Sequence, residues 1–242
     1  MLGLSTGLER SSFVGSEFNP KSSVNSNLAL WLDNNVNISA AVWQDASGNS
    51  NNVTAIEEFE PSVQGGGWHF NPGEEAPNVA TLGSSITASS QEGFMAFFVI
   101  DHDANDQRTL LGTGGTAEFI EIMNSKKIRI KIDGTTSTPT FAANQFVNDT
   151  KYILGIKRDA GSTGNLHIYK NGTLLTPTSQ LANTGAIAFS AIGARGDTGE
   201  PGGMDRAFDG HLYELLIYEG ATELTSGEIT KIHNFLASAH GL

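Results

Sequence analysis

The chain has 242 residues, no cysteine and a formal net charge of −12, with 38% hydrophobic and only 17% charged residues. A chain of this length can bury a sizeable core in one domain, and the lack of cysteine excludes disulfides, thiolate catalysis and cysteine-ligated zinc. The acidic excess repels phosphate backbones, so nucleic acid is not an expected partner.

The N-terminal segment, residues 1–25, is expected to be an arm that precedes a single domain at residues 26–242. It shows no hydrophobic period, yet it carries apolar residues that a free tail has no reason to hold. These are Leu2, Leu4, Leu8, Phe13 and Phe18. A frayed terminus is the alternative. The segment lacks the features of a signal peptide, and no stretch approaches the ~18 apolar residues of a membrane span, so no membrane partner is expected.

From residue 28 onward, short apolar runs alternate with clusters of Gly, Asn, Asp, Ser and Thr, a spacing typical of antiparallel sheets. Strands are expected at residues 28–32, 68–70, 81–86, 94–101, 108–112, 118–123, 127–133, 152–158, 166–170, 173–175, 186–193 and 211–218. The almost continuously apolar run at 94–101 predicts a central strand covered on both faces. The run at 127–133 alternates Ile with Lys and Arg, which predicts one solvent-facing side.

Turn and helix signals complete the predicted architecture. Asn171-Gly172 favours a tight hairpin, because both central positions of a type I′ turn need positive φ. A terminal helix is expected to begin at Ser226 as its cap and to end before Gly241. Its apolar residues recur at helical spacing: Ile229, Ile232, Phe235 and Leu236. We therefore expect an all-β, antiparallel two-sheet jelly-roll sandwich with a short C-terminal helix.

Three segments carry a family resemblance, in the correct order. They are residues 28–33 (LALWLD) with 43–49 (WQDASGN), residues 167–174 (HIYKNGTL), and residues 208–218 (FDGHLYELLIY) with 224–228 (LTSGE). Together they resemble the concanavalin A-like lectin/glucanase superfamily, specifically the laminin-G-like jelly rolls of bacterial surface proteins and tailed-phage virion proteins. The resemblance implies that Trp31 and Trp43 fill the sandwich and that Glu214 ties a loop to its strand.

Hydrolysis is not expected. The hydrolases of this superfamily carry the string E-x-D-x-x-E on one strand, which does not occur here, and a retaining hydrolase needs two carboxyl groups ~5 Å apart. Glu118 and Glu121 are three positions apart and should face opposite sides of a strand. Glu57, Glu58 and Glu60 lie in a polar stretch. We therefore predict no catalytic residue.

Sugar binding requires an exposed aromatic platform with polar loop residues beside it. The candidate platforms are Trp68, which follows a run of glycines, and Tyr218. The candidate polar partners are Asp103 and Asn105, which follow the expected central strand. These four residues form the candidate glycan site, and the alternative is that the aromatics belong to the core, as most aromatics at strand positions do.

No cofactor is required by the sequence, and calcium is the metal that its loops could hold. Carboxylates and carbonyls at a loop rim are the ligands that calcium prefers. The candidate ligands are Asp101, Asp103 and Asp106 after the central strand, and Asp197 and Asp205 in a Gly-rich loop. A solvated acidic loop is the alternative for both clusters. Asp197 also ends an Arg-Gly-Asp string, which we interpret as a chance match.

The expected function is a non-enzymatic virion structural or decoration protein, on the capsid or the tail, that presents a lectin-like sandwich. The arm would add contacts to other virion proteins or to further copies of the chain in a symmetric lattice. The alternative is a glycan-binding adhesin module, extracellular or at a cell surface, that holds cell-surface polysaccharide. A glycoside hydrolase is less favoured than either.

Overall fold

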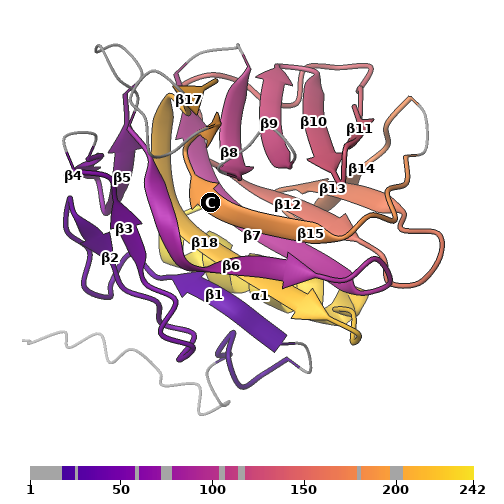
Figure 1. Cartoon of the computed structure of the whole chain (residues 1–242), viewed down its shortest axis with the longest axis horizontal. Coiled ribbons are helices and arrows are strands. Elements are labelled where there is room, and N and C mark those ends of the chain that lie inside the picture. Colours follow the sequence, from indigo (N-terminus) through magenta and orange to yellow (C-terminus); the bar gives the residue numbers. More distant parts are fainter. Residues whose placement is uncertain are drawn as a thin grey trace, which may run out of the picture.

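The computed structural model describes residues 18–24, 27–57, 60–71, 78–103, 107–113, 118–178, 181–196 and 204–242. Within these ranges the chain forms two eight-stranded antiparallel sheets, one two-stranded ribbon and one C-terminal helix. The two large sheets pack face to face as a sandwich (Figure 1). The predicted all-β fold is confirmed. Residues 1–17 of the predicted arm lie outside the described residues.

Sheet A has the strand order β14-β13-β12-β7-β18-β5-β4, and β1 also pairs with β18. Its strands are β1 (Asn27–Leu32), β4 (Ser62–Gln64), β5 (Gly67–Phe70), β7 (Gly93–His102), β12 (Tyr152–Arg158), β13 (Leu166–Lys170), β14 (Thr173–Leu175) and β18 (Gly210–Gly220). β7 lies between β12 and β18, and all of its residues except Asp101 are buried. The continuous apolar run thus forms the predicted central strand.

Sheet B has the order β11-β10-β9-β8-β15-β6-β3-β2. Its strands are β2 (Val42–Trp43), β3 (Val53–Ala55), β6 (Ala80–Ala88), β8 (Arg108–Gly112), β9 (Phe119–Asn124), β10 (Lys127–Ile132), β11 (Thr135–Ser137) and β15 (Ile187–Ile192). The ribbon pairs β16 (Arg195–Gly196) with β17 (Met204–Asp205). It attaches to sheet B through the Gly196 N–H, which donates to the Thr113 carbonyl.

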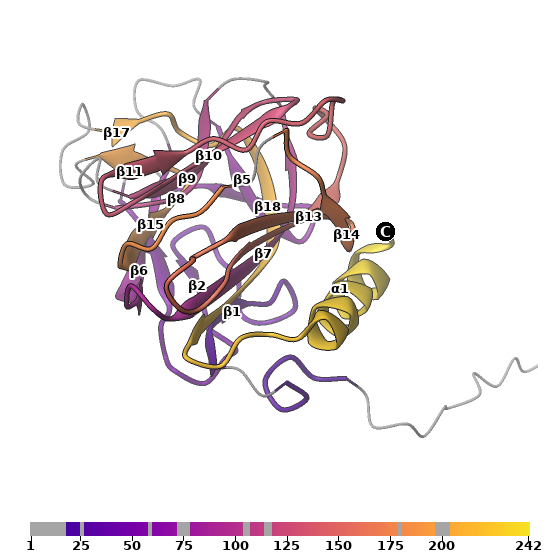
Figure 2. The same cartoon turned by 90° about the vertical axis from the view of Figure 1, so that its right-hand side faces the viewer.

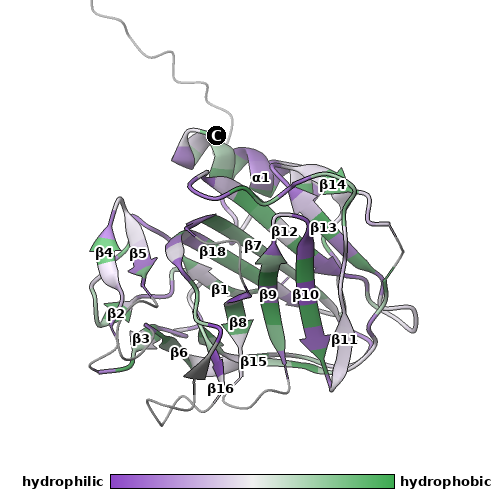
Figure 3. Cartoon of the chain, turned by 90° about the horizontal axis from the view of Figure 1, so that it is seen from above, coloured by the Kyte–Doolittle hydropathy of each residue, from purple (hydrophilic) through white to green (hydrophobic). Residues whose placement is uncertain are grey.

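The core between the sheets is apolar and aromatic. Figure 3 shows hydrophobic residues concentrated in β7, β12 and β18 of sheet A and along β9 and β10 of sheet B. Trp43 and Trp68 are fully buried and meet edge to face, with ring centroids 5.4 Å apart. Because such pairs add stabilisation to the burial of their area, they anchor the end of the sandwich where β2 and β5 lie. Trp43 is confirmed as a core residue.

Helix α1 (Ser226–His240) covers part of the outer face of sheet A, the face that points away from sheet B (Figure 2). Ile229, Ile232 and Leu236 of the helix belong to a second apolar layer there. The sheet side of this layer includes Trp31, Phe97, Val99, Leu216 and Tyr218. Over the described part of the chain, we find no helix with the length and apolar character needed to cross a membrane.

The cap of α1 is Thr225, not Ser226 as predicted. Thr225 has extended backbone angles, its hydroxyl accepts from the Glu228 N–H, and the Glu228 carboxylate accepts from the Thr225 N–H. This reciprocal pair is a capping box, which satisfies two otherwise free N–H groups. Ser226 is the first helical residue. The helix ends at His240, before its C-cap Gly241, as expected.

The turn after Trp43 ties the first strand of the sandwich to its neighbours. The Asp45 carboxylate accepts from the backbone N–H groups of Trp31, Ser47 and Asn51. The Asn49 amide donates to the Leu28 carbonyl. Hydrogen bonds to a charged group are strong, so Asp45 holds these backbone segments together. The segment at 43–49, which carries part of the family resemblance, therefore has a structural role here.

Candidate functional site

Trp68, a predicted sugar platform, is a core residue. Its ring is fully buried on β5, and its Nε1–H donates to the Ser39 carbonyl at 2.7 Å. The preceding glycines indicated a loop, but Gly65 and Gly66 form a tight turn and Gly67 begins β5. A Cβ at Gly67 would lie 2.3 Å from the Leu212 carbonyl oxygen. Here glycine permits close approach to β18, so the prediction of an exposed ring was wrong.

Tyr218, the other predicted platform, is also buried. It is 2% exposed, it lies in the apolar layer beneath α1, and its hydroxyl donates to the Pro20 carbonyl at 3.1 Å. It lies on the outer face of sheet A, where the helix and the segment at 18–24 cover it. Tyr218 therefore has no ring face available to a sugar.

Asp101 is held by its neighbours on β18. Its Oδ1 lies 2.8 Å from His211 Nδ1, and its Oδ2 accepts from the Tyr213 hydroxyl at 2.7 Å. Burial raises the pKa of Asp101, but the hydrogen bonds from Tyr213 and His211 outweigh this effect, so the net pKa lies below its ordinary value. The same burial and the bond to Asp101 raise the pKa of Tyr213. Asp101 is thus an ionised anchor for two aromatic rings.

These rings belong to a stacked row on the outer face of sheet A, beside α1. The His69 and His211 centroids are 4.3 Å apart, and His211 stacks on Tyr213 at 5.4 Å. Lys151 covers Tyr213, with Nζ 3.8 Å from the ring centroid. Asp103, a predicted glycan and calcium ligand, is 42% exposed and lies 3.7 Å from His69 Nε2. The rings of the row contact one another and Lys151, so little of their aromatic faces is open to a ligand.

The predicted calcium site stays a prediction. Asn105, Asp106 and Asp197 lie outside the described residues, and for Asp205 only the backbone, in β17, is described. Among the residues that are described, no three His, Asp or Glu side chains come together as a metal site would require. The carboxylate of Asp101 is occupied by His211 and Tyr213.

A bulge in β18 explains how the end of α1 is fixed. The register of β18 against β7 shifts between Leu212 and Glu214, and a bulge lets two successive residues share a face. Glu214 accepts from Trp31 Nε1 at 2.8 Å and lies 2.7 Å from His240 Nε2. Glu214 thus connects β18 to β1 and to the last turn of α1, a structural role of the kind that the resemblance implied.

A polar groove of about 490 Å³ lies on the outer face of sheet B. We call it the basic groove, and its residues are Phe119, Arg129, Lys131, Thr136, Thr138, Arg195 and Arg206. It is on the opposite side of the sandwich from α1, because it belongs to sheet B and the helix covers sheet A. None of its lining residues was predicted as a site residue.

Strand pairing between β9 and β10 builds the floor of the basic groove. The isoleucines of β10 point into the core: Ile128, Ile130 and Ile132. Successive side chains of a strand face opposite sides, so Arg129 and Lys131 point outward. The antiparallel register sets Arg129 opposite Glu121 and Lys131 opposite Phe119.

Glu121 is fully buried beneath the groove and holds three arginines together. Its carboxylate oxygens lie 2.9 Å from Arg195 Nε, 3.3 Å from Arg206 Nη1 and 3.5 Å from Arg129 Nη1. Burial raises the pKa of Glu121, and the positive charges of the arginines oppose that rise. A buried ionised carboxylate is costly unless it is paired, so the arginines are required to keep it there.

An aromatic ring fixes one side of the groove. Phe119 is 3% exposed, and the guanidinium carbon of Arg195 lies 4.2 Å from its ring centroid. Lys131 Nζ lies 5.9 Å from the same centroid. Cations over an aromatic face are attracted by its quadrupole. Phe119 therefore helps to set the positions of two cationic side chains.

The sequence indicated the direction of some of the side chains that line the groove. The alternating run at 127–133 predicted that Arg129 and Lys131 face away from the core, and the structure confirms it. Arg195 opens the Arg-Gly-Asp string, and in the structure it pairs with Glu121. Arg206 contacts Glu121 across 85 residues of sequence. No local pattern predicts that convergence.

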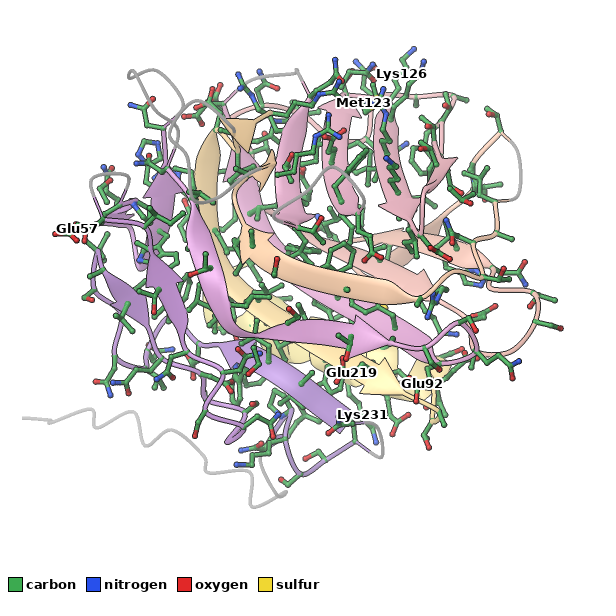
Figure 4. The ribbon with its side chains drawn as sticks, viewed as in Figure 1. Glu57, Glu92, Met123, Lys126, Glu219 and Lys231 are labelled. Carbon is green, nitrogen blue, oxygen red and sulfur yellow. The ribbon has the colours of Figure 1, made fainter. Side chains whose placement is uncertain are left out.

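The glutamates considered for catalysis are separate from one another. Glu118 is buried, with its carboxylate accepting from the Ala188 N–H, whereas Glu121 faces the arginines. Glu57 is exposed at the edge of the sandwich and points away from it (Figure 4). Glu58 lies outside the described residues. Glu118 and Glu121 therefore have different partners and do not act as a pair.

No protein-family model matches the sequence, and no curated protein matches it. Solved structures share its fold. The binding domain of botulinum neurotoxin DC, solved with rat synaptotagmin II, matches with a TM-score of 0.61 and 17% identity, over 87% of this chain and 52% of that chain. Botulinum neurotoxin type C, whose cell entry depends on interaction with two ganglioside molecules, gives 0.60 and 14%, over 87% and 51%.

A mutant of Trypanosoma rangeli sialidase with trans-sialidase activity gives a TM-score of 0.56 and 15% identity, over 88% of this chain and 33% of that chain. The chain thus spans about half the length of the neurotoxin chains and a third of the sialidase. At these identities the likeness concerns the fold alone. The chain has a lectin-like β-sandwich fold.

The Asp101 anchor predicts a pH-dependent loss of stability. A carboxyl group whose pKa is lowered on folding stabilises the protein above its ordinary pKa of 3.8, and this contribution is lost as the pH falls through the lowered value. Asp101→Asn should therefore reduce the free energy of unfolding by about 2 kcal/mol at pH 7 and by less at pH 2. Urea unfolding at both pH values measures the difference. Asp103→Asn is the control, with little effect expected at either pH, and an equal loss for Asp101→Asn at both values would contradict the assignment.

Proposed function

We propose that the chain is a non-enzymatic glycan-binding module that presents a lectin-like sandwich, and that the basic groove is its binding surface. The observation that carries the proposal is the groove itself, about 490 Å³ in volume and lined by guanidinium, ammonium and hydroxyl groups beside one phenyl ring. Small-ligand sites are concave and use placed polar groups to fix the orientation of the ligand, and this groove carries six cationic or hydroxyl side chains. The ganglioside interaction named for botulinum neurotoxin type C supports this class of ligand.

The chemistry of the groove supports a binding role without catalysis. Glycoside hydrolysis uses a pair of carboxyl groups on the two sides of the scissile bond. Among the described residues that line the groove there is no carboxylate, and Glu121 beneath it is paired with arginines. Glu118, the glutamate nearest to Glu121 in the sequence, accepts a hydrogen bond from the Ala188 N–H. The described groove offers donors for a ligand and no acid–base pair.

A glycan array tests the proposed function. The wild-type chain should bind a subset of glycans, and Arg129→Ala should weaken that binding about tenfold, because a hydrogen bond to a charged group contributes ~1.5 kcal/mol or more. Lys126→Ala is the matched control, since Lys126 is an exposed cation at the turn between β9 and β10 and does not line the groove (Figure 4). It should stay within about twofold of wild type, which is ~0.4 kcal/mol. Absence of binding to any glycan would contradict the proposal.

We further propose that this module is a structural or decoration protein of a virion, on the capsid or the tail, and that its N-terminal arm contacts other virion proteins or further copies of the chain. The observation that bears on the arm is the anchoring of residues 18–24. The rings of Phe18 and Phe235 of α1 lie 5.9 Å apart, and the Pro20 carbonyl accepts from Tyr218. This places the start of the described chain beside a hollow of about 550 Å³, lined by Phe18, Lys231, Asn234, Phe235, Ser238 and Ala239.

Light scattering tests the role of the arm. The full chain should assemble into oligomers, and a chain that begins at residue 18 should be monomeric, because it lacks the apolar residues that contact a neighbour while it keeps Phe18 on α1. Unchanged circular dichroism of the shorter chain controls for folding. If the full chain is monomeric at all concentrations, alone and with virions, the assembly role is wrong and the glycan-binding role is unaffected.

A further inference from the structure

We infer that the basic groove takes an acidic saccharide, one whose sugar ring carries a carboxylate or a sulfate, with that oxyanion placed against Arg129. This inference rests on the proposed function and names its ligand class. The first observation is the distribution of charge. The chain has 14 Lys and Arg residues against 26 Asp and Glu, yet four of the 14 cations line this one groove and none of its described lining residues is acidic.

The second observation is that the donors of Arg129 are only partly used. A guanidinium carries five N–H donors, and the contacts of Arg129 with Gln107 and Glu121 both use Nη1. The contact with Glu121 is 3.5 Å long, longer than the ~2.8 Å of a strong charge-assisted hydrogen bond. A ligand oxyanion can make shorter bonds to Arg129.

The third observation is that Arg129 is both positioned and accessible. Its guanidinium contacts Glu121 and donates to the Gln107 side chain at 3.1 Å, and its side chain is 24% exposed. A guanidinium fixed on one side by hydrogen bonds presents its remaining edge with little loss of entropy on binding. Carboxylate and sulfate groups match that edge because they accept two parallel N–H bonds.

The rest of the groove fits a saccharide better than a bare anion. Thr136 is exposed and Thr138 is partly exposed, and both line the groove. Threonine hydroxyls donate and accept, as sugar hydroxyls do. A volume of about 490 Å³ exceeds that of a single sulfate or carboxylate group. The net charge of −12 disfavours a nucleic acid, whose many phosphates would meet the acidic remainder of the surface.

Titration calorimetry of the full chain tests the inference with four probes: oligogalacturonate for the carboxylate, dextran sulfate for the sulfate, neutral dextran, and single-stranded DNA. We expect one or both acidic saccharides to bind at least tenfold more tightly than neutral dextran and than DNA. Arg129→Ala should remove that preference, Arg129→Lys should retain part of it, and Lys126→Ala should leave it unchanged. The melting temperatures of the variants control for folding.

Each other outcome overturns a separate statement. If neutral dextran binds as tightly as the acidic saccharides and binding still depends on Arg129, the proposed function stands and the inferred ligand class is wrong. If DNA binds as tightly as the acidic saccharides, or if Lys126→Ala weakens binding as much as Arg129→Ala, the groove is not selective and the inference is wrong. If no saccharide binds here or on the glycan array, the proposed function itself fails.

Discussion

The buried carboxylate of Glu121 is the interaction on which the basic groove depends. It gathers three arginines that come from different parts of the chain: β10, β16 and the residue after β17. Three guanidinium groups at this spacing would repel one another without a counter-charge, and a carboxylate without cations would be costly to bury. The groove therefore requires the ribbon to dock on sheet B. That docking is close, since a Cβ at Gly112 would lie 2.5 Å from the Ala194 carbonyl oxygen.

The two outer faces of the sandwich have different chemistry. On sheet A, α1 and the segment at 18–24 cover an apolar layer, and the row of His69, His211 and Tyr213 continues beside it, held by Asp101. On sheet B, Phe119 of β9 and Arg129 and Lys131 of β10 line an open groove. The first face is suited to contacts with protein and the second to a polar ligand. The proposed roles would use the two faces separately, with protein contacts on the first and a glycan on the second.

Local sequence patterns predicted the strands and turns that neighbouring residues determine. The apolar run of β7, the alternation of β10 and the Asn171-Gly172 turn, with φ of 47° and 75°, all formed as expected. The short strands β3, β4 and β11 were not predicted, because three residues carry too little pattern to distinguish a strand from a loop. Thr225 and Ser226 are both suitable caps, and only the position of Glu228, three residues after Thr225, distinguishes them.

The site was harder to predict because it depends on contacts between distant residues. Trp68 was a candidate for an exposed ring, since its glycines suggested a loop, but they permit a tight turn and close strand pairing. The outward direction of Arg129 followed from strand alternation. The approach of Arg206 to Glu121 depends on how the ribbon folds back on sheet B, which no spacing along the chain records.

The measurement that tests the account most directly is an NMR titration of the arginine Nε–Hε groups with an oligosaccharide that the chain binds. We expect saturable shifts at Arg129 and its neighbours in the groove, Arg195 and Arg206. Arg158, which is 1% exposed and donates to the Ser89 and Glu92 carbonyls, should not move and serves as the internal reference. Binding that leaves the groove arginines unshifted, or that shifts Arg158 equally, would contradict the claim that the basic groove is the binding surface.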